Sequence, residues 1–426
     1  MLAALPGLAP STQPPELTAS VGKPYSVFAV ADNIYVISIF NNQIDVRDKD
    51  SVCVDSLLCI PVNAAAHIIV TLNIEESSNT NLAVAWYAVF YYHLRKLKEE
   101  CCIEHFTIVT NATADVVFLG SSVMLDLLSS IPNLLTMHWF MCTQHVLYPQ
   151  QFNWNPTSNR VLYFPGKLDK IHRVGPLYSI LTNNRYKTNC VYAYTANQSV
   201  WNGGNRNLAV LYEQYYTTVS DLLGMYNTSI SDYDNTVKLL EENEKDIDGM
   251  QAECRSHQRC SVAPISSEVY SSISVELISE TWFPSLTEHL TEKTFRAMLA
   301  GQPFIHVSSM VTCYLNALGF KTFRNLTGDR WDSHGYTNIA MITYSNDIEM
   351  QIQDLHSNVA AAFELADKCK NEVRTQQQVR DIIQFNRQKC EQIIAKTKND
   401  LNRRHNGVFG NNDTLFDRFF SIHGLY

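Results

Sequence analysis

The chain has 426 residues and an apolar fraction of 46%, which is enough for two or three globular domains with cores of their own. Its formal net charge of −9 is spread without a basic block, which argues against a dedicated nucleic-acid or anionic-membrane binder. No apolar run reaches the roughly 18 residues of a membrane span. The N-terminus does not resemble a signal peptide, and the 11 Cys lack the spacing of a disulfide framework, so we expect a cytoplasmic protein.

The first part of the sequence predicts an arm followed by an α/β domain. Residues 1–24 are rich in Pro, Ser and Thr and are expected to form a flexible arm. Residues 25–156 alternate strand-like and helix-like segments, which favours a Rossmann-like domain. The expected strands are 25–30, 34–40, 66–74, 105–109, 116–119 and 136–140, and the expected helices lie within 81–99 and 123–128.

Two neighbouring acids, Glu75 and Glu76, directly follow the apolar segment 66–74. Ligands of parallel sheets lie beyond the carboxyl ends of the strands, so this pair is expected to face a ligand. One carboxylate could then act as a general base, with Glu76 as the first candidate and Glu75 as the second. The alternative is a solvated acidic loop.

Residues 157–345 are expected to form a second Rossmann-like domain. Its first strand is predicted at 160–164, followed by a loop at 165–173 and a helix from Leu177 onward. The loop holds four basic or potentially basic side chains, including Lys170 and Arg173, and could bind phosphate where the helix begins. A solvent-facing turn is the alternative.

The segment 280–323 has the strongest local signals. Apolar residues at helical spacing follow Thr291, and Gly301 and Pro303 are typical of the end of that helix. A buried strand is expected at 304–307, a second helix that ends at Gly319, and a further strand at 320–323.

The start of this first helix resembles a phosphate site. Thr291 can cap the helix, whose N-terminus carries a partial positive charge to which Lys293 adds a full one. Glu292 can accept hydrogen bonds from ribose hydroxyls. From the residues alone, an ordinary αβ unit with a surface Glu–Lys pair is the alternative.

Neither a metal nor another cofactor is expected. The acidic segment 221–248 contains Asp232-Tyr233-Asp234 and Asp246-Ile247-Asp248, and an Asp-x-Asp pair can hold a divalent ion on a diphosphate. In so acidic a segment, a solvated helix face explains the pattern equally simply.

The C-terminal segment, residues 346–426, is predicted to be helical. It has few Gly or Pro, and its apolar residues recur at helical spacing. The last residues present an apolar face that needs a partner. Either this face packs back on the domains, or it contacts a second copy in a homo-oligomer.

The stretch from Glu280 to Phe323 resembles the donor-binding segment of a group of phage and large-virus glycosyltransferases. The shared features are a Glu-Thr pair, Thr-Glu-Lys-Thr before a helix, a small-x-Pro-Phe-Ile strand and Gly-Phe-x-Thr-Phe. Its Thr-Glu-Lys core is similar to that of α-1,3-fucosyltransferases. The resemblance implies that Glu292 contacts the donor ribose and Lys293 the diphosphate, and it extends to Arg173 and Lys170 as further diphosphate contacts.

This resemblance implies an α/β protein with two Rossmann-like domains of the GT-B type and a helical C-terminal extension. The expected activity is inverting, metal-independent transfer of a sugar from a GDP- or UDP-linked donor to a hydroxyl of a glycan, protein or modified nucleobase, in the host cytoplasm if the protein is viral. The alternative is a non-enzymatic virion or assembly protein that keeps the fold. The candidate donor-binding residues are Glu292, Lys293, Thr291, Arg173, Lys170 and Glu280.

Overall fold

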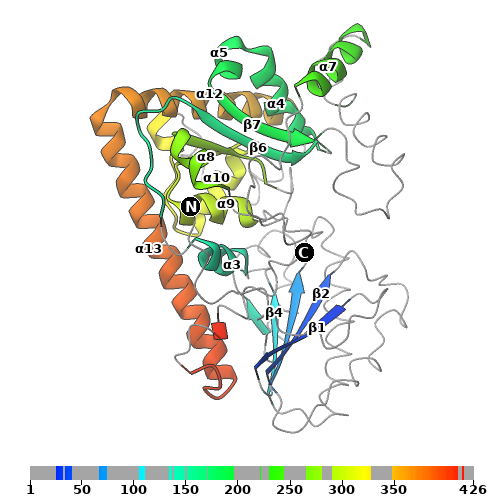
Figure 1. Ribbon diagram of the computed structural model, residues 1–426, viewed down its shortest axis with the longest axis vertical. Coiled ribbons are helices and arrows are strands. Elements are labelled where there is room, and N and C mark those ends of the chain that lie inside the picture. Colours follow the sequence, from blue (N-terminus) through cyan, green and yellow to red (C-terminus); the bar gives the residue numbers. More distant parts are fainter. Residues whose placement is uncertain are drawn as a thin grey trace. The chain divides into compact units, whose positions relative to one another are not determined.

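The computed structural model describes residues 25–31, 34–40, 67–73, 105–110, 134–136, 139–148, 151–168, 170–195, 221, 230–243, 265–280, 290–327, 348–410 and 415–416. The chain forms two compact units, residues 1–146 with 391–426 and residues 147–390, so the expected C-terminal segment 346–426 contributes to both. The elements are labelled in Figure 1. The predictions for 1–24, 81–99, 116–119 and 123–128 fall outside the described residues.

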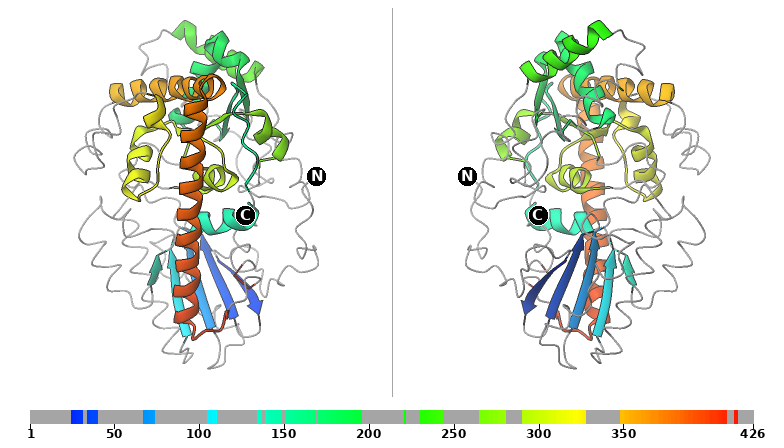
Figure 2. Two further views of the ribbon diagram at one scale, coloured as in Figure 1. Left: turned by 90° about the vertical axis from the view of Figure 1, so that its left-hand side faces the viewer. Right: turned by 90° about the vertical axis from the view of Figure 1, so that its right-hand side faces the viewer.

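The first unit contains a five-stranded sheet, seen in Figure 2 as blue to cyan strands. Its strands are β1 (Tyr25–Ala31), β2 (Ile34–Phe40), β3 (His67–Asn73), β4 (His105–Thr110) and β5 (Leu134–Thr136), in that spatial order. β1 is antiparallel to β2 and the other pairs are parallel. Among the described strands the order runs in one direction, and four of the five strands are parallel, so the predicted α/β character of this region is seen in its sheet.

The strand expected at 136–140 is wrong. β5 ends at Thr136, and helix α3 (Trp139–Leu147) begins three residues later. A short apolar run that includes Trp139 and Phe140 does not distinguish a buried strand from the start of a helix. The helix buries Met141 and Cys142, and burial raises the pKa of the Cys142 thiol to about 12.

The second unit contains a four-stranded parallel sheet with strand order β7-β6-β8-β9. The strands are β6 (Val161–Lys167), β7 (Cys190–Thr195), β8 (Val275–Ile278) and β9 (Phe304–His306). From β6 the chain moves outward to β7, then returns to β8 on the other side of β6 and continues to β9. The winding therefore reverses between β6 and β8, which is the place where ligands bind in open α/β sheets.

The helices of this part of the chain alternate with the strands and continue into a long C-terminal pair (Figure 1). They are α4 (Ile171–Thr182), α5 (Asn184–Thr188), α7 (Ile230–Glu242), α8 (Ser267–Ser272), α9 (Glu292–Ala300), α10 (Ser309–Ala317), the short 3₁₀ helix η7 (Arg324–Thr327), α12 (Ile348–Asn371) and α13 (Val373–Arg404).

Helices cover both faces of the parallel sheet. On one face, the Tyr163 hydroxyl donates a 2.8 Å hydrogen bond to the carbonyl oxygen of Arg173 in α4. The neighbouring residue on β6, Leu162, is in register with Glu276 of β8, whose carboxylate binds Arg296 of α9. Because alternate residues of a strand point to opposite faces, α4 and α9 lie on opposite faces. α12 packs against α4 and against β8 and β9.

The boundaries predicted for α9 are confirmed. Thr291 caps the helix by accepting from the backbone N–H of Lys293, and Gly301 follows in the left-handed conformation with φ of 80°. The predicted core side chains of this helix and of β9 are each at most 2% exposed. They are Phe295, Met298, Leu299, Phe304 and Ile305.

Residues 320–323 do not form the expected strand. The segment belongs to no sheet in the described part of the chain, although Phe320 and Phe323 are buried. The side chain of Asn386 on α13 accepts from the backbone N–H of Lys321 at 2.9 Å and donates to its carbonyl oxygen at 2.7 Å. A side-chain amide thus takes both backbone groups that a neighbouring strand would have used.

The C-terminal region is helical, as predicted, and α12 is part of the core of the second unit. Asp354 of α12 accepts from the backbone N–H of Ser309 at 2.7 Å and from its hydroxyl, and Asn358 donates to Val307 O at 3.0 Å. The chain turns after α13, where Asn406 has a positive φ of 53°. No helix within the described ranges is long and apolar enough to cross a membrane.

Candidate functional site

The loops after β6 and β8 meet at the point where the winding of the sheet reverses. The imidazole Nε2 of His172 lies 2.8 Å from the carbonyl oxygen of Glu280, and the Ser279 hydroxyl donates to the His172 carbonyl oxygen at 3.1 Å. Because a carbonyl oxygen can only accept, Nε2 of His172 carries the proton. We call this region the switch-point site; it comprises Lys170, His172, Arg173, Glu280, Thr291, Glu292 and Lys293.

The basic stretch enters this site on a helix rather than on the loop expected at 165–173. β6 continues to Lys167, because Gly166 and Lys167 pair with β7 beyond an irregularity around Pro165. Proline has no N–H to contribute to the ladder, which explains the irregularity. α4 then begins at Ile171, so Arg173 lies in its first turn and only 7% of it is exposed.

Three cations act on one buried imidazole. Burial lowers the pKa of His172 well below its usual range, and the positive charges of Arg173, Lys170 and Lys293 lower it further. Lys170 and Arg173 come from the beginning of α4, whereas Lys293 comes from the beginning of α9. The two predicted phosphate sites are linked through Glu280, whose backbone carbonyl oxygen binds His172 of α4 and whose carboxylate binds Thr291 at the start of α9.

Glu280 is buried beneath the first turn of α9. Its carboxylate accepts from the backbone N–H of Thr291 at 3.2 Å and from the hydroxyls of Thr291 and Thr294. Burial raises the pKa of Glu280, while the charge of Lys293 and the two threonine hydroxyls oppose that shift. Both carboxylate oxygens thus contact the protein at the start of the helix.

Glu292 and Lys293 lie nearer the surface. The Lys293 Nζ is 2.8 Å from Glu292 Oε1 and 3.3 Å from Thr291 Oγ1, and the two side chains are 13% and 15% exposed. Burial would raise the pKa of Glu292, but the charge of Lys293 and its hydrogen bond outweigh it and the pKa is lowered. A negatively charged carboxylate and an ammonium group therefore lie together at the start of α9.

The helices that begin at this edge of the sheet differ in how their N-termini are capped. At the start of α10, the backbone N–H of Ser309 donates to the buried carboxylate of Asp354. At the start of α9, the backbone N–H of Thr291 donates to the carboxylate of Glu280. At α4 the N-cap residue is Lys170, whose side chain makes no cap bond, while its backbone carbonyl oxygen accepts from the N–H of Arg173 at 2.9 Å. The start of α4 thus holds two basic residues, Lys170 and Arg173, where the starts of the other two helices hold a carboxylate.

Two of the sequence-derived groups are not part of the described site. Glu75 and Glu76 fall outside the described residues, so the position of the predicted base remains a prediction. Asp232 and Asp234 lie on α7. In the described ranges no three His, Cys, Asp or Glu side chains are grouped so as to hold a metal ion.

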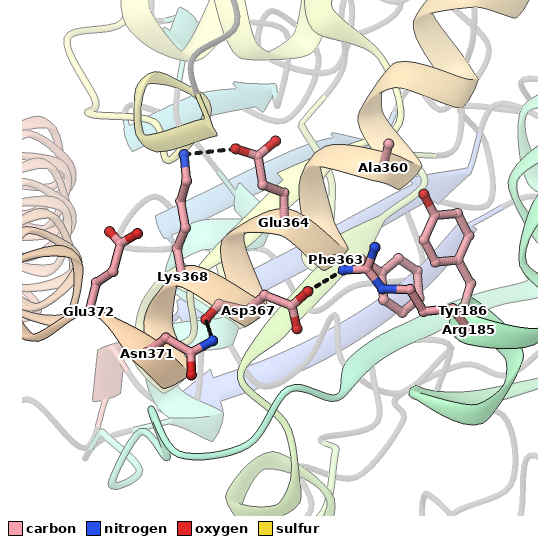
Figure 3. A pocket seen from close by; sticks show the side chains of 9 residues that line it. All are labelled: Arg185, Tyr186, Ala360, Phe363, Glu364, Asp367, Lys368, Asn371 and Glu372. Atoms are coloured by element: carbon pink, nitrogen blue, oxygen red, sulfur yellow. Dashed lines mark hydrogen bonds and ion pairs between the residues drawn. The ribbon is translucent and has the colours of Figure 1, made fainter.

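A surface pocket of about 370 Å³ lies elsewhere on the second unit, between α5 and α12 (Figure 3). Because α5 directly precedes β7, this pocket belongs to the amino edge of the sheet, whereas the switch-point site lies at the carboxyl edge. Both of its basic side chains are already paired, since Arg185 binds Asp367, and Lys368 binds Glu364 at 2.7 Å. We therefore place the candidate site at the switch point.

Sequence reasoning did not assign His172, Thr294 or His306 a role of their own. His172 stood in the basic stretch and Thr294 in Thr-Glu-Lys-Thr, but a single His or Thr in such a position carries no signal of burial.

Comparisons of the chain with models of known families, with curated proteins and with solved structures find no match.

Proposed function

We propose that this protein is a glycosyltransferase of the GT-B type that binds a nucleotide-sugar donor at the switch-point site. The observation that carries the proposal is the pair of hydrogen bonds, His172 with Glu280 and Glu280 with Thr291, that join the start of α4 to the start of α9 at the reversal of a parallel sheet. Lys170 and Arg173 stand at the first of these helix starts, and Glu292 and Lys293 at the second. The resemblance of residues 280–323 to viral donor-binding segments supports the same assignment.

The chemistry of these groups suits a nucleoside diphosphate. The positive end of α4 and the three cations complement a diphosphate, whose charge is the largest on the donor. Glu292 is an acceptor for the paired hydroxyls of a ribose. These groups suit the diphosphate and ribose that GDP- and UDP-linked sugars share.

In the proposed reaction, an acceptor hydroxyl attacks the anomeric carbon of the sugar while its bond to the diphosphate breaks. Negative charge grows on the leaving diphosphate, where Lys293, Arg173 and the start of α4 would stabilise it. These groups would supply that charge stabilisation without a divalent cation. A carboxylate of the first domain, with Glu76 preferred over Glu75, would remove the proton of the hydroxyl, and attack from the opposite side would invert the anomeric centre.

A thermal-shift screen of GDP-, UDP- and dTDP-sugars tests the proposal. A ligand that binds only the folded chain stabilises it by about 2.7 kcal/mol at about 100 times its dissociation constant. We expect one nucleotide class to raise the unfolding temperature, and Lys170→Ala to weaken this effect. Lys370→Ala, which removes an exposed cation from α12, is the matched control and should leave the shift unchanged.

Transfer itself is tested by following the donor that gives the largest shift by NMR, which also reports the anomeric configuration of the product. If no nucleotide-sugar shifts the unfolding temperature, the enzyme proposal fails. The non-enzymatic virion or assembly protein that keeps the fold would then be the better explanation.

A further inference from the structure

A chain of four buried polar side chains runs beneath the first turn of α9. The imidazole Nε2 of His306 lies 2.8 Å from the hydroxyl oxygen of Thr294, which donates to the carboxylate of Glu280. The Thr291 hydroxyl donates to the second oxygen of the same carboxylate. Each of the four side chains is at most 3% exposed, so these bonds form in a region from which water is excluded.

The protons of this chain have one consistent arrangement. A threonine hydroxyl has a single proton, and Thr294 gives its proton to Glu280, so it must accept from the Nε2–H of His306. Thr291 likewise gives its proton to Glu280, and its oxygen accepts from the backbone N–H of Lys293 at 3.4 Å and from Nζ at 3.3 Å. The chain therefore runs from the end of β9 to the ammonium group of Lys293.

The two ends of the chain are anchored on neighbouring strands. His306 is the last residue of β9 and is in register with Ile278 of β8, two residues before Glu280. The start of α9 is thus tied to the carboxyl ends of both strands by side chains, in addition to its own Thr291 cap. A rigid attachment of this kind is what holds a binding group in a productive direction.

We propose that Thr294 and His306 are positioning residues, which act through Glu280 and Thr291 to aim Lys293 and Glu292 at the ligand of the switch-point site. The inference rests on the proposed function for the identity of that ligand. In this inference Glu280 orients the first turn of α9 and does not contact the donor itself. Thr294 and His306 also act without touching the donor.

A double-mutant cycle separates positioning from simple stabilisation. Thr294→Val keeps the shape of the side chain but removes the hydroxyl, and Thr294→Ser restores the hydroxyl. The affinities of each variant for GDP and UDP are measured by calorimetry, with and without Lys293→Ala. We expect Thr294→Val to weaken binding by about tenfold and Thr294→Ser by less than about threefold. Once Lys293 is absent, Thr294→Val should have a smaller effect, because only the positioning of Glu292 is then left to lose.

If the losses caused by Thr294→Val and Lys293→Ala multiply, Thr294 does not act through Lys293 and the inference is overturned. If Thr294→Val does not fold, the same cycle is run with His306→Gln, which keeps an N–H donor, against His306→Leu, which does not. We then expect the Leu variant to weaken binding and the Gln variant to restore most of it, and equal binding by both would overturn the inference.

If the wild-type protein binds neither GDP nor UDP, the proposed function is contradicted but the positioning role of Thr294 is not. That role is then tested by the rate at which an amine-acetylating reagent labels Lys293, measured by mass spectrometry relative to Lys370. We expect Thr294→Val to raise the relative rate severalfold and Thr294→Ser to leave it near the wild-type value. Identical rates in all three proteins would show that Thr294 does not hold Lys293.

Discussion

The imidazole of His172 donates a 2.8 Å hydrogen bond from Nε2 to the carbonyl oxygen of Glu280. This bond joins the first turn of α4, which follows β6, to the residues that follow β8. Because β6 and β8 are neighbours at the reversal of the sheet, the bond sets the spacing between the basic groups of α4 and those of α9.

Lys293→Ala should abolish most donor binding while the fold stays intact. A charge-assisted contact to phosphate contributes about 1–3 kcal/mol, so the affinity measured by calorimetry should fall about 5- to 150-fold. The variant should still unfold cooperatively in urea, although Glu292 loses the cation that offsets its burial. Lys370→Ala serves as the control, and an unchanged affinity in Lys293→Ala would contradict the assignment of the diphosphate site.

Transfer should depend on one carboxylate of the first domain, with Glu76 as the first candidate and Glu75 as the second. Replacement by Gln keeps the size of the side chain and removes its basicity, so the variant that lacks the base should lose on the order of 10²–10⁴ in rate. Adjacent side chains in an extended segment point in different directions, so only one of the two variants should be affected. Full turnover by both, once donor and acceptor are known, would place the base elsewhere.

The stability of the protein should fall on acidification, partly because of His306. Burial lowers the pKa of His306 to about 3 from its ordinary value of 6.5. Between these pH values the unfolded protein binds a proton at His306 that the folded protein does not. The contribution of the neutral imidazole to the unfolding free energy is therefore fully present above about pH 6.5 and is lost as the pH falls toward 3. One such group contributes about 1.4 kcal/mol for each pH unit.

Urea denaturation at pH 7.5, 6 and 5 measures this dependence. The unfolding free energy of His306→Gln should depend less steeply on pH than that of the wild type, because unfolding of the variant takes up about one proton fewer. His356→Gln is the comparison, because burial lowers the pKa of His356 on α12 as well but by less than that of His306, so its removal should alter this dependence less. Identical slopes for the wild type and His306→Gln would mean that the imidazole of His306 is not kept neutral by burial.

Asn386→Ala should destabilise the second unit. The change leaves the backbone N–H and carbonyl groups of Lys321 without the side-chain amide that now serves both. A hydrogen bond contributes about 0.5–1.5 kcal/mol, so the loss of both should lower the unfolding free energy by about 1–3 kcal/mol, which urea denaturation can measure. Asn371→Ala, at an exposed position on α12, should cost less than about 0.5 kcal/mol, and equal effects of the two changes would contradict the account given for residues 320–323.

The sequence by itself determined the features that depend on residues close together in the chain. The span of α9 follows from the Thr291 cap and from Gly301 and Pro303, because capping bonds and left-handed backbone geometry involve only neighbouring residues. The pairing of Glu292 with Lys293 and the helical C-terminal region could be predicted for the same reason.

The tertiary structure alone decided which distant groups meet. The apolar segments at 136–140 and 320–323 had the composition of strands, but one of them holds the start of α3 and the other is bound by Asn386 of α13. The joining of α4 to α9 through His172, and the burial of Thr294 and His306, depend on strand order. A local pattern cannot show these features, because a hydrogen-bond partner and the exclusion of water are supplied by whichever segments pack against a residue.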